Sequence, residues 1–316
     1  MPGSSNLDRA SSIFEKGPKN TPASGASASI SWGLPFLTFE LCSNDPAVLA
    51  RAEIIFRPWR SARSLNPIRH LSVEPADGDN EQLARHWKVR SGGNGAPLFA
   101  HSVAHAVMMV EFLAIQALIE HCDGFLSFHG ALVEKHGKGA LILGRGESGK
   151  STLVCALWRR GWTLLGDDIT LVDLAAGSAY PAPRRVALRY ASRKLFGEEL
   201  WARILAAPSC DETTEGYLFH PDEIDTKKRS ASTRLSTVIF LQRRENSAAP
   251  AILERLEPAH ALLAFLPYLN LIQRLDFGEA IRCTAPFADA VPAYDLGRGP
   301  LEKMAQSVER LLESDC

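Results

Sequence analysis

The chain has 316 residues, of which 46% are hydrophobic and 22% are charged, a composition typical of a soluble globular protein with room for two domains. Its 35 basic and 36 acidic residues leave a net charge of -1, so bulk electrostatics favours neither nucleic acid nor a membrane surface as a partner. The six cysteines show no Cys-x-x-Cys or other tight ligand spacing, which favours reduced thiols in a cytoplasmic protein over a zinc site. No basic patch precedes an apolar run near the N-terminus, so no secretory signal is expected.

The first part of the chain predicts a tail and a small domain. Residues 1–31 are rich in Ser, Gly, Ala, Pro and Asn, so they are expected to form a disordered tail. Residues 32–122 are expected to form a small α+β N-terminal domain. Its predicted elements are strands over 34–41, 68–73 and 86–90 and helices over 45–57 and 101–121. The apolar run 106–119 carries Glu111 and Gln116 and is too short to cross a bilayer, so it should be a core helix.

Residues 123–316 alternate short strands with helices, which predicts an α/β domain. The expected strands cover 127–134, 139–143, 163–165, 169–173 and 237–241, and helices cover 152–160, 258–266 and 301–312. The first of these helices should end at Arg159-Arg160-Gly161, because basic side chains suit the carboxyl end of a helix and glycine adopts the left-handed cap conformation.

A phosphate-binding loop lies inside this domain. Residues 144–152 read GRGESGKST and match G-x-x-x-x-G-K-[ST] without a mismatch, between an apolar strand and a helix. Backbone amides of such a glycine-rich loop and of the helix N-terminus face the phosphates. Lys150 would bind the β and γ phosphates, and the Ser151 hydroxyl would ligate Mg²⁺. The predicted nucleotide-binding residues are Gly144, Arg145, Gly146, Glu147, Ser148, Gly149, Lys150, Ser151 and Thr152.

Two further features flank the loop. Asp167 and Asp168 lie 17 and 18 residues after Lys150, at the end of the next strand. They could ligate Mg²⁺ or accept the proton of an attacking hydroxyl, although an Asp pair can also simply cap a hairpin. His129 lies on a strand 21 residues before Lys150, and a lone histidine in that position is usually structural.

Taken together, the segments 128–134, 144–151 and 160–168 resemble the catalytic core of the bacterial HPr kinase/phosphorylase family, with the His-Gly, phosphate-loop and Asp-Asp elements in ungapped register over about 45 residues. The resemblance implies a P-loop kinase domain of the HPr kinase C-terminal type that uses ATP and Mg²⁺. It implies that Lys150 and Ser151 bind phosphates and Mg²⁺. Asp168 would be the general base, supported by Asp167, also a metal ligand, and by His129.

The chain departs from the family pattern in three places. Glu147 replaces the glycine that is usual in the loop, no glutamate lies near Arg193 where the family has a metal ligand, and the phosphorylase segment is not found after Leu241. Glu198 or Glu199 could replace the metal ligand only with a rearranged backbone. The resemblance is therefore to HPr-kinase-like proteins without phosphorylase activity, some of which modify ribosomal peptides.

Other candidate groups lie outside this core. The basic segment 183–189 could bring an arginine to the transferring phosphoryl group, or it could be a solvated strand. His101 and His105 are four residues apart, but no third ligand accompanies them, which argues against a metal site.

The expected function is an ATP- and Mg²⁺-dependent kinase that transfers the γ-phosphoryl group to a serine of a peptide or small protein. Two alternatives stay open. One is a nucleotide-gated ATPase or regulatory protein whose N-terminal domain binds a partner, and the other is a small-molecule kinase with the same core chemistry. Neither nucleic acid nor a membrane is an expected partner, and a homo-oligomer is compatible with the resemblance because the related kinases form rings.

Overall fold

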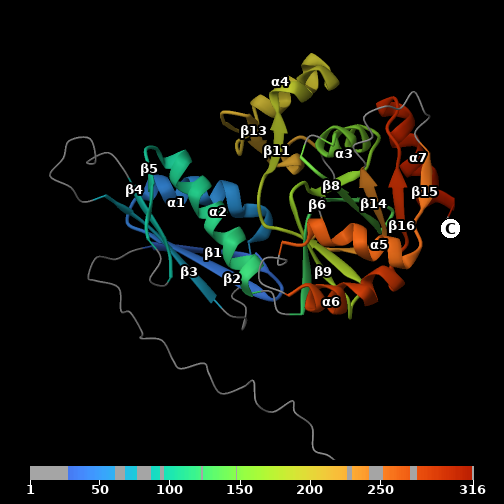
Figure 1. Ribbon diagram of the computed structural model, residues 1–316. Helices are drawn as coiled ribbons and strands as arrows, with labels where there is room; N and C mark the ends of the chain where they lie inside the picture. The colour runs from blue at the N-terminus through green and yellow to red at the C-terminus, as the bar shows by residue number, and fades with distance from the viewer. Residues whose placement is uncertain are drawn as a thin grey trace, which may run out of the picture.

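The computed structural model describes residues 28–60, 68–76, 87–92, 96–121, 124–146, 148–225, 230–241, 252–270 and 276–314. They form an N-terminal unit around one sheet, a larger unit around a second sheet, and a small third sheet beside them (Figure 1). The α/β fold class predicted from the sequence is confirmed. Of the predicted tail, only residues 28–31 are described.

The N-terminal unit is a five-stranded sheet with two helices packed on it. Its strands run in the spatial order β1 (Ala28–Leu34), β2 (Leu37–Ser43), β3 (Ile68–Pro75), β4 (Trp87–Ser91) and β5 (Leu98–Ala100). Helix α1 (Pro46–Phe56) leads through the short turn η1 (Arg57–Trp59) towards β3, and α2 (Val103–His121) follows β5. Asp45 caps α1 by accepting the N–H of Ala47 at 2.9 Å, as expected of an aspartate just before a Pro at the first helical position.

Helix α2 is the predicted core helix. It is the one described helix that is long and apolar enough to cross a membrane by length and composition, with a mean hydropathy of 1.6. One face of the helix, which includes Val107, Val110 and Leu118, is buried in the same core as β1 to β4, whereas Phe112 is exposed. Packing on the sheet accounts for the apolar residues of the buried face.

One predicted strand was wrong in its extent. Residues 34–41 were expected to form a single strand, but the chain turns at 35–36 and β1 pairs antiparallel with β2, with Leu34 opposite Leu37. A Cβ on Gly33 would lie 2.2 Å from the Leu37 carbonyl oxygen, so only glycine allows this close approach. Residues 28–31 belong to β1 rather than to a tail, because they complete the pairing with the far end of β2.

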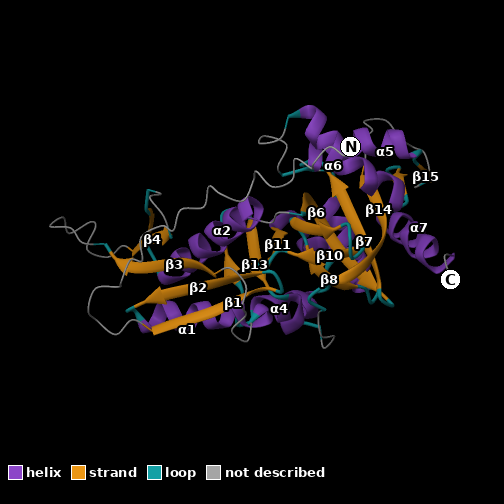
Figure 2. Ribbon diagram, turned by 90° about the horizontal axis from the view of Figure 1, so that it is seen from below, coloured by secondary structure: helices purple, strands orange, loops and turns teal. Residues whose placement is uncertain are grey.

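The larger unit is an eight-stranded sheet between two helical layers (Figures 1 and 2). Its strands are β6 (Phe125–Lys135), β7 (Lys138–Gly144), β8 (Thr163–Gly166), β9 (Ile169–Asp173), β10 (Ser178–Pro181), β14 (Thr233–Leu241), β15 (Leu253–Arg255) and β16 (Ala293–Leu296). The spatial order is β10-β9-β6-β7-β14-β16-β15, and β8 also pairs with β6. Strands β7, β14 and β16 are parallel, so their carboxyl ends share the edge where β7 leads into the phosphate loop.

Alternate side chains of β6 enter different cores. Ala131 and Val133 pack with α3 (Lys150–Arg159) and α7 (Leu301–Ser314). Leu132 packs on the other face with α5 (Pro258–Phe265), η4 (Leu266–Tyr268) and α6 (Phe277–Ala290). This two-residue alternation is the geometry of a strand buried on both faces.

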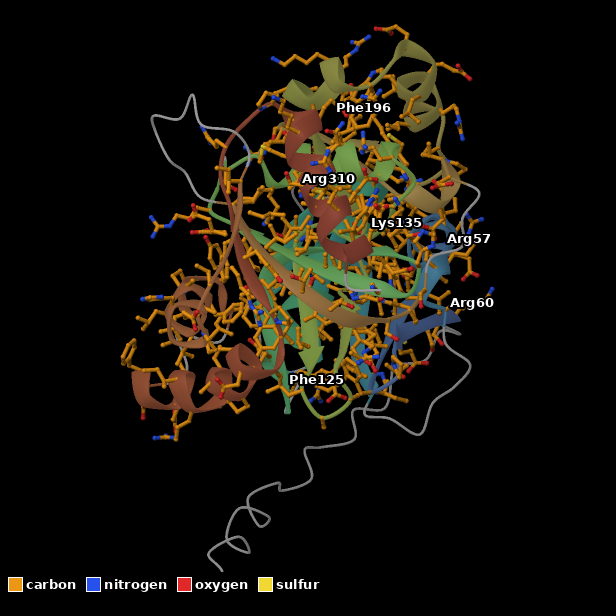
Figure 3. The ribbon with its side chains drawn as sticks, turned by 90° about the vertical axis from the view of Figure 1, so that its right-hand side faces the viewer. Arg57, Arg60, Phe125, Lys135, Phe196 and Arg310 are labelled. Atoms are coloured by element: carbon orange, nitrogen blue, oxygen red, sulfur yellow. The ribbon has the colours of Figure 1, made fainter. Side chains whose placement is uncertain are left out.

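Charged contacts also tie α7 to the sheet. Figure 3 shows Lys135 at the end of β6 near α7, which carries Arg310, and Lys135 Nζ lies 3.1 Å from Glu309 Oε1 of that helix. The lysine therefore links the β6–β7 hairpin to the C-terminal helix.

The small sheet is formed by the part of the chain between β10 and β14 of the larger sheet. It consists of β11 (Val186–Arg189), β13 (Gly216–Phe219) and β12 (Asp211–Glu212), with η2 (Tyr190–Leu195), α4 (Glu198–Leu205) and η3 (Pro221–Glu223) around it. His220 directly precedes η3 and is buried, with Nε2 2.6 Å from the Ile55 carbonyl oxygen of α1. Ala187 of β11 donates its N–H to Asp167 of the larger unit at 2.7 Å, so this region contacts both larger units.

Candidate active site

The phosphate loop joins β7 to α3. Gly149 is the N-terminal cap of α3 with φ of 94° and no side-chain capping bond, a left-handed conformation that favours glycine. The helical hydrogen bonds begin with Leu153 N–H, which donates to the Gly149 carbonyl at 2.9 Å. The amides of the first turn are thus left for an anion at the helix N-terminus. Predicted residue Glu147 lies outside the described residues.

Ser148 is a buried residue of this loop and packs against Gly144. Its N–H donates to the Arg145 carbonyl at 3.1 Å, and a Cβ on Gly144 would lie only 2.3 Å from the Ser148 Oγ. Glycine at 144 therefore makes room for the serine hydroxyl. Ser148 is 5% exposed, and its Oγ has no hydrogen-bond partner among the described residues. A buried hydroxyl without a partner is costly, and a phosphate oxygen would satisfy it.

Four predicted or suspected residues meet next to the loop in one chain of contacts. Lys150 Nζ lies 3.2 Å from His129 Nε2, and His129 Nδ1 lies 2.9 Å from Asp168 Oδ1. Arg184 Nη1 donates to the other oxygen, Asp168 Oδ2. Because Lys150 can only donate and the carboxylate can only accept, the imidazole carries its proton on Nδ1.

The backbone explains why His129 and Asp168 are neighbours. His129 on β6 pairs with Ile169 on β9, Gly130 N–H donates to the Asp168 carbonyl at 2.8 Å, and Thr170 Oγ1 donates to the Gly130 carbonyl at 3.0 Å. A Cβ on Gly130 would lie 2.5 Å from Leu143 Cδ2. The glycine after His129 therefore lets β6 lie close to β7.

The two aspartates have opposite environments. Asp167 is 8% exposed and accepts the Ala187 N–H at 2.7 Å. Burial raises its pKa to about 6, against the lowering effect of Arg184. Burial also acts on Asp168, but the hydrogen bond from His129 and the charge of Arg184 outweigh it and bring the pKa down to about 2. Burial lowers the pKa of Lys150, while both aspartates oppose that shift. Asp168 is therefore ionised at neutral pH.

The predicted Mg²⁺ ligands Ser151 and Asp167 carry the oxygen donors that Mg²⁺ prefers. Ser151 lies in the first turn of α3, and the charge of Lys150 beside it acts on Asp167. No group of three or more His, Cys, Asp or Glu side chains that could hold a metal occurs among the described residues. Mg²⁺ commonly takes one or two protein ligands and completes its shell with phosphate oxygens and water, so a hydroxyl and one carboxylate suffice. Glu198 makes an exposed ion pair with Arg193 instead (3.6 Å).

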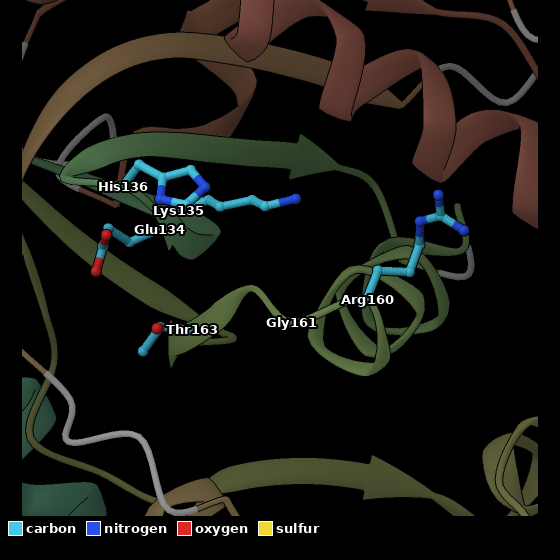
Figure 4. A pocket seen from close by; sticks show the side chains of 6 residues that line it. All are labelled: Glu134, Lys135, His136, Arg160, Gly161 and Thr163. Atoms are coloured by element: carbon cyan, nitrogen blue, oxygen red, sulfur yellow. The ribbon is translucent and has the colours of Figure 1, made fainter.

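A separate cavity of about 480 Å³ lies at the far end of α3 (Figure 4). It is lined by Glu134, Lys135, His136, Arg160, Gly161 and Thr163. Its cations are already engaged, since Lys135 and Arg160 both pair with Glu309. Gly161 has φ of 85°, the left-handed cap predicted for this helix. The cavity is a feature of the helix end and not of the phosphate loop.

The basic segment 183–189 was predicted either to bring an arginine to the site or to form a solvated strand, and it has features of both. Arg184 reaches Asp168, as expected of an arginine at the site, whereas Arg189 is exposed on β11. The sequence interpretation missed Arg185, which is buried and pairs with Glu111 of α2. The one available signal was the acidic residue inside the apolar helix, because a charge there requires a buried partner.

A comparison with curated proteins supports the resemblance. No protein-family model matches the chain. Among curated proteins, the chain is 31% identical over 78 residues to an HPr kinase/phosphorylase of Chlorobium phaeobacteroides, a match covering 25% of this chain and 24% of that protein. Among solved structures, it matches the Hpr(Ser) kinase/phosphatase from Coxiella burnetii with 13% identity and a TM-score of 0.32, over 60% of this chain and 95% of that chain.

The predicted resemblance to HPr kinase/phosphorylase is confirmed. The matched part spans about a quarter of the curated relative.

Proposed function

We propose that this protein is an ATP- and Mg²⁺-dependent kinase that transfers the γ-phosphoryl group to a hydroxyl, the acceptor being a serine of a peptide or small protein. The observation that carries the proposal is the continuous series of contacts from Lys150 through His129 to Asp168 and Arg184, next to a phosphate loop. A phosphate-binding lysine and a carboxylate that orients the hydroxyl are two of the groups, beside Mg²⁺, that serve phosphoryl transfer to a hydroxyl in P-loop and protein kinases.

In this mechanism Asp168 binds and orients the acceptor hydroxyl. Its low pKa keeps it ionised, so it accepts the hydroxyl hydrogen bond in the ground state. In a loose phosphoryl-transfer transition state the proton moves late, and orientation contributes more than base strength. The hydroxyl oxygen bonds to the γ-phosphorus as the bond to the β-phosphate oxygen breaks, ADP leaves, and the hydroxyl proton passes to the Asp168 carboxylate. His129 fixes the direction of that carboxylate.

Asp167 is better suited to the metal than to the proton. Its pKa of about 6 would suit a base, but it is buried and one of its oxygens accepts the Ala187 amide. The Ser151 hydroxyl and Asp167 would hold Mg²⁺, which neutralises developing charge on the phosphates. Lys150 and the amides of the loop would bind the phosphate oxygens, and Ser148 would donate its buried hydroxyl.

The experiment is a transfer assay with γ-labelled ATP, Mg²⁺ and candidate serine peptides. Lys150→Ala and Asp168→Asn are each expected to reduce transfer by about 10²- to 10³-fold, the usual effect of removing one transition-state contact. Lys138→Ala is the matched control, because Lys138 lies at the opposite end of β7 and bonds the Leu312 carbonyl at 3.0 Å. Transfer that survives both site substitutions would contradict the proposal. Phosphate release without a phosphorylated acceptor would instead indicate an ATPase.

A further inference from the structure

One short segment supplies partners to both aspartates. Arg184 pairs with Asp168, and Ala187 N–H donates to Asp167 Oδ2 at 2.7 Å. The same segment is bonded to β9 through Ala182 N–H, which donates to the Ile169 carbonyl at 3.0 Å. The position of residues 182–187 therefore sets the geometry around both carboxylates.

Arg185, in the middle of this segment, points away from the site into a buried cluster. Its Nη2 lies 2.6 Å and its Nε 3.1 Å from Glu111 Oε2. Its Nη1 lies 2.5 Å from Asp211 Oδ2 and 2.9 Å from the Ser209 carbonyl. Glu111 Oε1 also accepts the backbone N–H of Arg185 at 3.2 Å. One glutamate therefore holds both the side chain and the backbone of the segment.

Glu111 belongs to a distant part of the chain. It lies on α2 of the N-terminal unit, 74 residues before Arg185. Other contacts cross the same boundary, including an ion pair of 2.7 Å between Arg51 of α1 and Asp211. Arg57, labelled in Figure 3, pairs with Glu223 at 3.1 Å. Among these polar contacts between described residues, the Glu111 contact is the one made to the segment that carries the partners of the aspartates, and Ala182 of that segment also packs in the N-terminal core.

We infer that Glu111 is a positioning residue of the phosphoryl-transfer site, which acts through Arg185 to hold Arg184 against Asp168 and Ala187 against Asp167. The inference rests on the proposed function. It makes the N-terminal unit a part of the active-site scaffold. A displacement of about 1 Å, caused far from the chemistry, can reduce a rate by about 10²-fold. A loosened segment should thus impair turnover more than nucleotide binding, because the phosphate loop lies on β7 and α3.

The test compares Glu111→Gln with Arg57→Gln in the full chain. Glutamine keeps the size of the side chain and an oxygen that can accept from Arg185, but it removes the charge. Glu111→Gln is expected to lower kcat by about tenfold or more, with KM for ATP changed by less than about twofold. Arg57→Gln removes an ion pair from the same boundary and should keep the wild-type kcat.

The split between kcat and KM separates positioning from a general loss of structure, because the phosphate loop that binds ATP lies between β7 and α3, outside the segment 182–187. Circular dichroism and the unfolding midpoint establish that each variant is folded.

Asp211→Asn is the second variant, because Asp211 contacts Arg185 from the other side and is partly exposed. It should lower kcat by about two- to fivefold, again with KM for ATP changed by less than about twofold. A folded Glu111→Gln protein with wild-type kcat would overturn the inference, as would a folded Asp211→Asn protein with wild-type kcat if Glu111→Gln does not fold. An equal loss in Arg57→Gln would overturn it too. Wild-type protein that turns over no ATP would overturn the proposed function, and the inference with it. Wild-type phosphate release without an acceptor would overturn only the kinase assignment, and the variants are then compared by that release.

Discussion

Two consecutive arginines make ion pairs of opposite character in this protein. Arg184 and Asp168 are 29% and 30% exposed in their side chains, whereas Arg185 and Glu111 are 0% and 7% exposed. The first pair lies where a substrate could reach it, and the second is sealed between two units of the fold. Ion pairs near water contribute little to stability and are free to rearrange, whereas a buried pair is expensive to break. The difference in burial therefore suits Arg184 to a role in the reaction and Arg185 to a role in holding the fold together.

The largest expected effect is on stability. Arg185→Ala should lower the free energy of unfolding by about 3–5 kcal/mol, because it leaves Glu111 as a buried, uncompensated charge. Arg184→Ala should lower it by less than about 1 kcal/mol. Equilibrium urea unfolding followed by circular dichroism measures both. Similar losses in the two variants would show that burial does not distinguish the pairs.

The exposed Arg184, whose loss should hardly change stability, should matter strongly for activity. Arg184→Ala is expected to lower kcat by about 10²-fold while the protein keeps its fold, because a cation next to the reacting groups is lost. Arg189→Ala is the matched control, since Arg189 is exposed on β11 and lies 3.8 Å from Glu215. Initial rates of ATP turnover at saturating ATP give the comparison. If Arg184→Ala and Arg189→Ala have equal kcat values, Arg184 has no role in the reaction.

The sequence predicted the local parts of this arrangement well. The strand before the loop, the helix after it and the glycine at its end depend on apolar patterning and glycine conformation within a few residues, and each is observed. The position of His129 alone favoured a structural role, and only the resemblance to the HPr kinase family placed it with Lys150 and Asp168; the structure brings the three together.

Features that depend on contacts between distant segments could not be predicted from the sequence. The short strands β10 to β13, β15 and β16 are two to four residues long, too short to show a periodic pattern. Nothing in residues 183–189 indicates which arginine is buried, because that depends on where α2 packs. Glu111 signalled a buried partner, but its identity follows only from the tertiary structure.

Asp167 and Asp168 also differ in burial, and the difference should appear in the pH dependence of stability. Asp167 has a folded-state pKa of about 6, above its ordinary value of 3.8. Its ionisation therefore costs stability as pH rises from about 4 to about 6. Asp167→Asn lacks this cost, so its stability relative to wild type should rise over that range, by about 2 kcal/mol.

Asp168 should show the opposite sign. Its folded-state pKa of about 2 lies below the ordinary 3.8, so it contributes stability above pH 4 that is lost as pH falls towards 2. Asp168→Asn should be less stable than wild type near pH 6, and the difference should shrink below pH 4. Urea unfolding of both variants from pH 3 to pH 7 measures the two trends. Parallel trends would mean that burial and the His129 and Arg184 contacts do not separate the two carboxyl groups.

The smallest effect concerns two buried serines, one with a partner and one without. Ser127 is buried on β6, and its Oγ accepts from Asn270 Nδ2 at 2.9 Å, whereas the Ser148 Oγ has no hydrogen-bond partner among the described residues. Ser127→Ala should therefore cost about 1 kcal/mol of stability and leave ATP affinity unchanged. Ser148→Ala should leave stability unchanged or raise it by up to about 1 kcal/mol, because an unsatisfied buried hydroxyl is removed.

Ser148→Ala should at the same time weaken ATP binding by about fivefold, the effect of about one hydrogen bond. Titration with a fluorescent ATP analogue gives the dissociation constants, and thermal unfolding gives the stabilities. The two serine variants should therefore change different quantities, Ser127→Ala the unfolding midpoint and Ser148→Ala the dissociation constant. If Ser148→Ala destabilises the fold and binds ATP as wild type does, its hydroxyl serves the loop and not the phosphate. An unsatisfied buried hydroxyl in the loop lowers the stability of the free protein, and a bound phosphate would supply its missing partner, which is the relation between stability and function expected at a binding site.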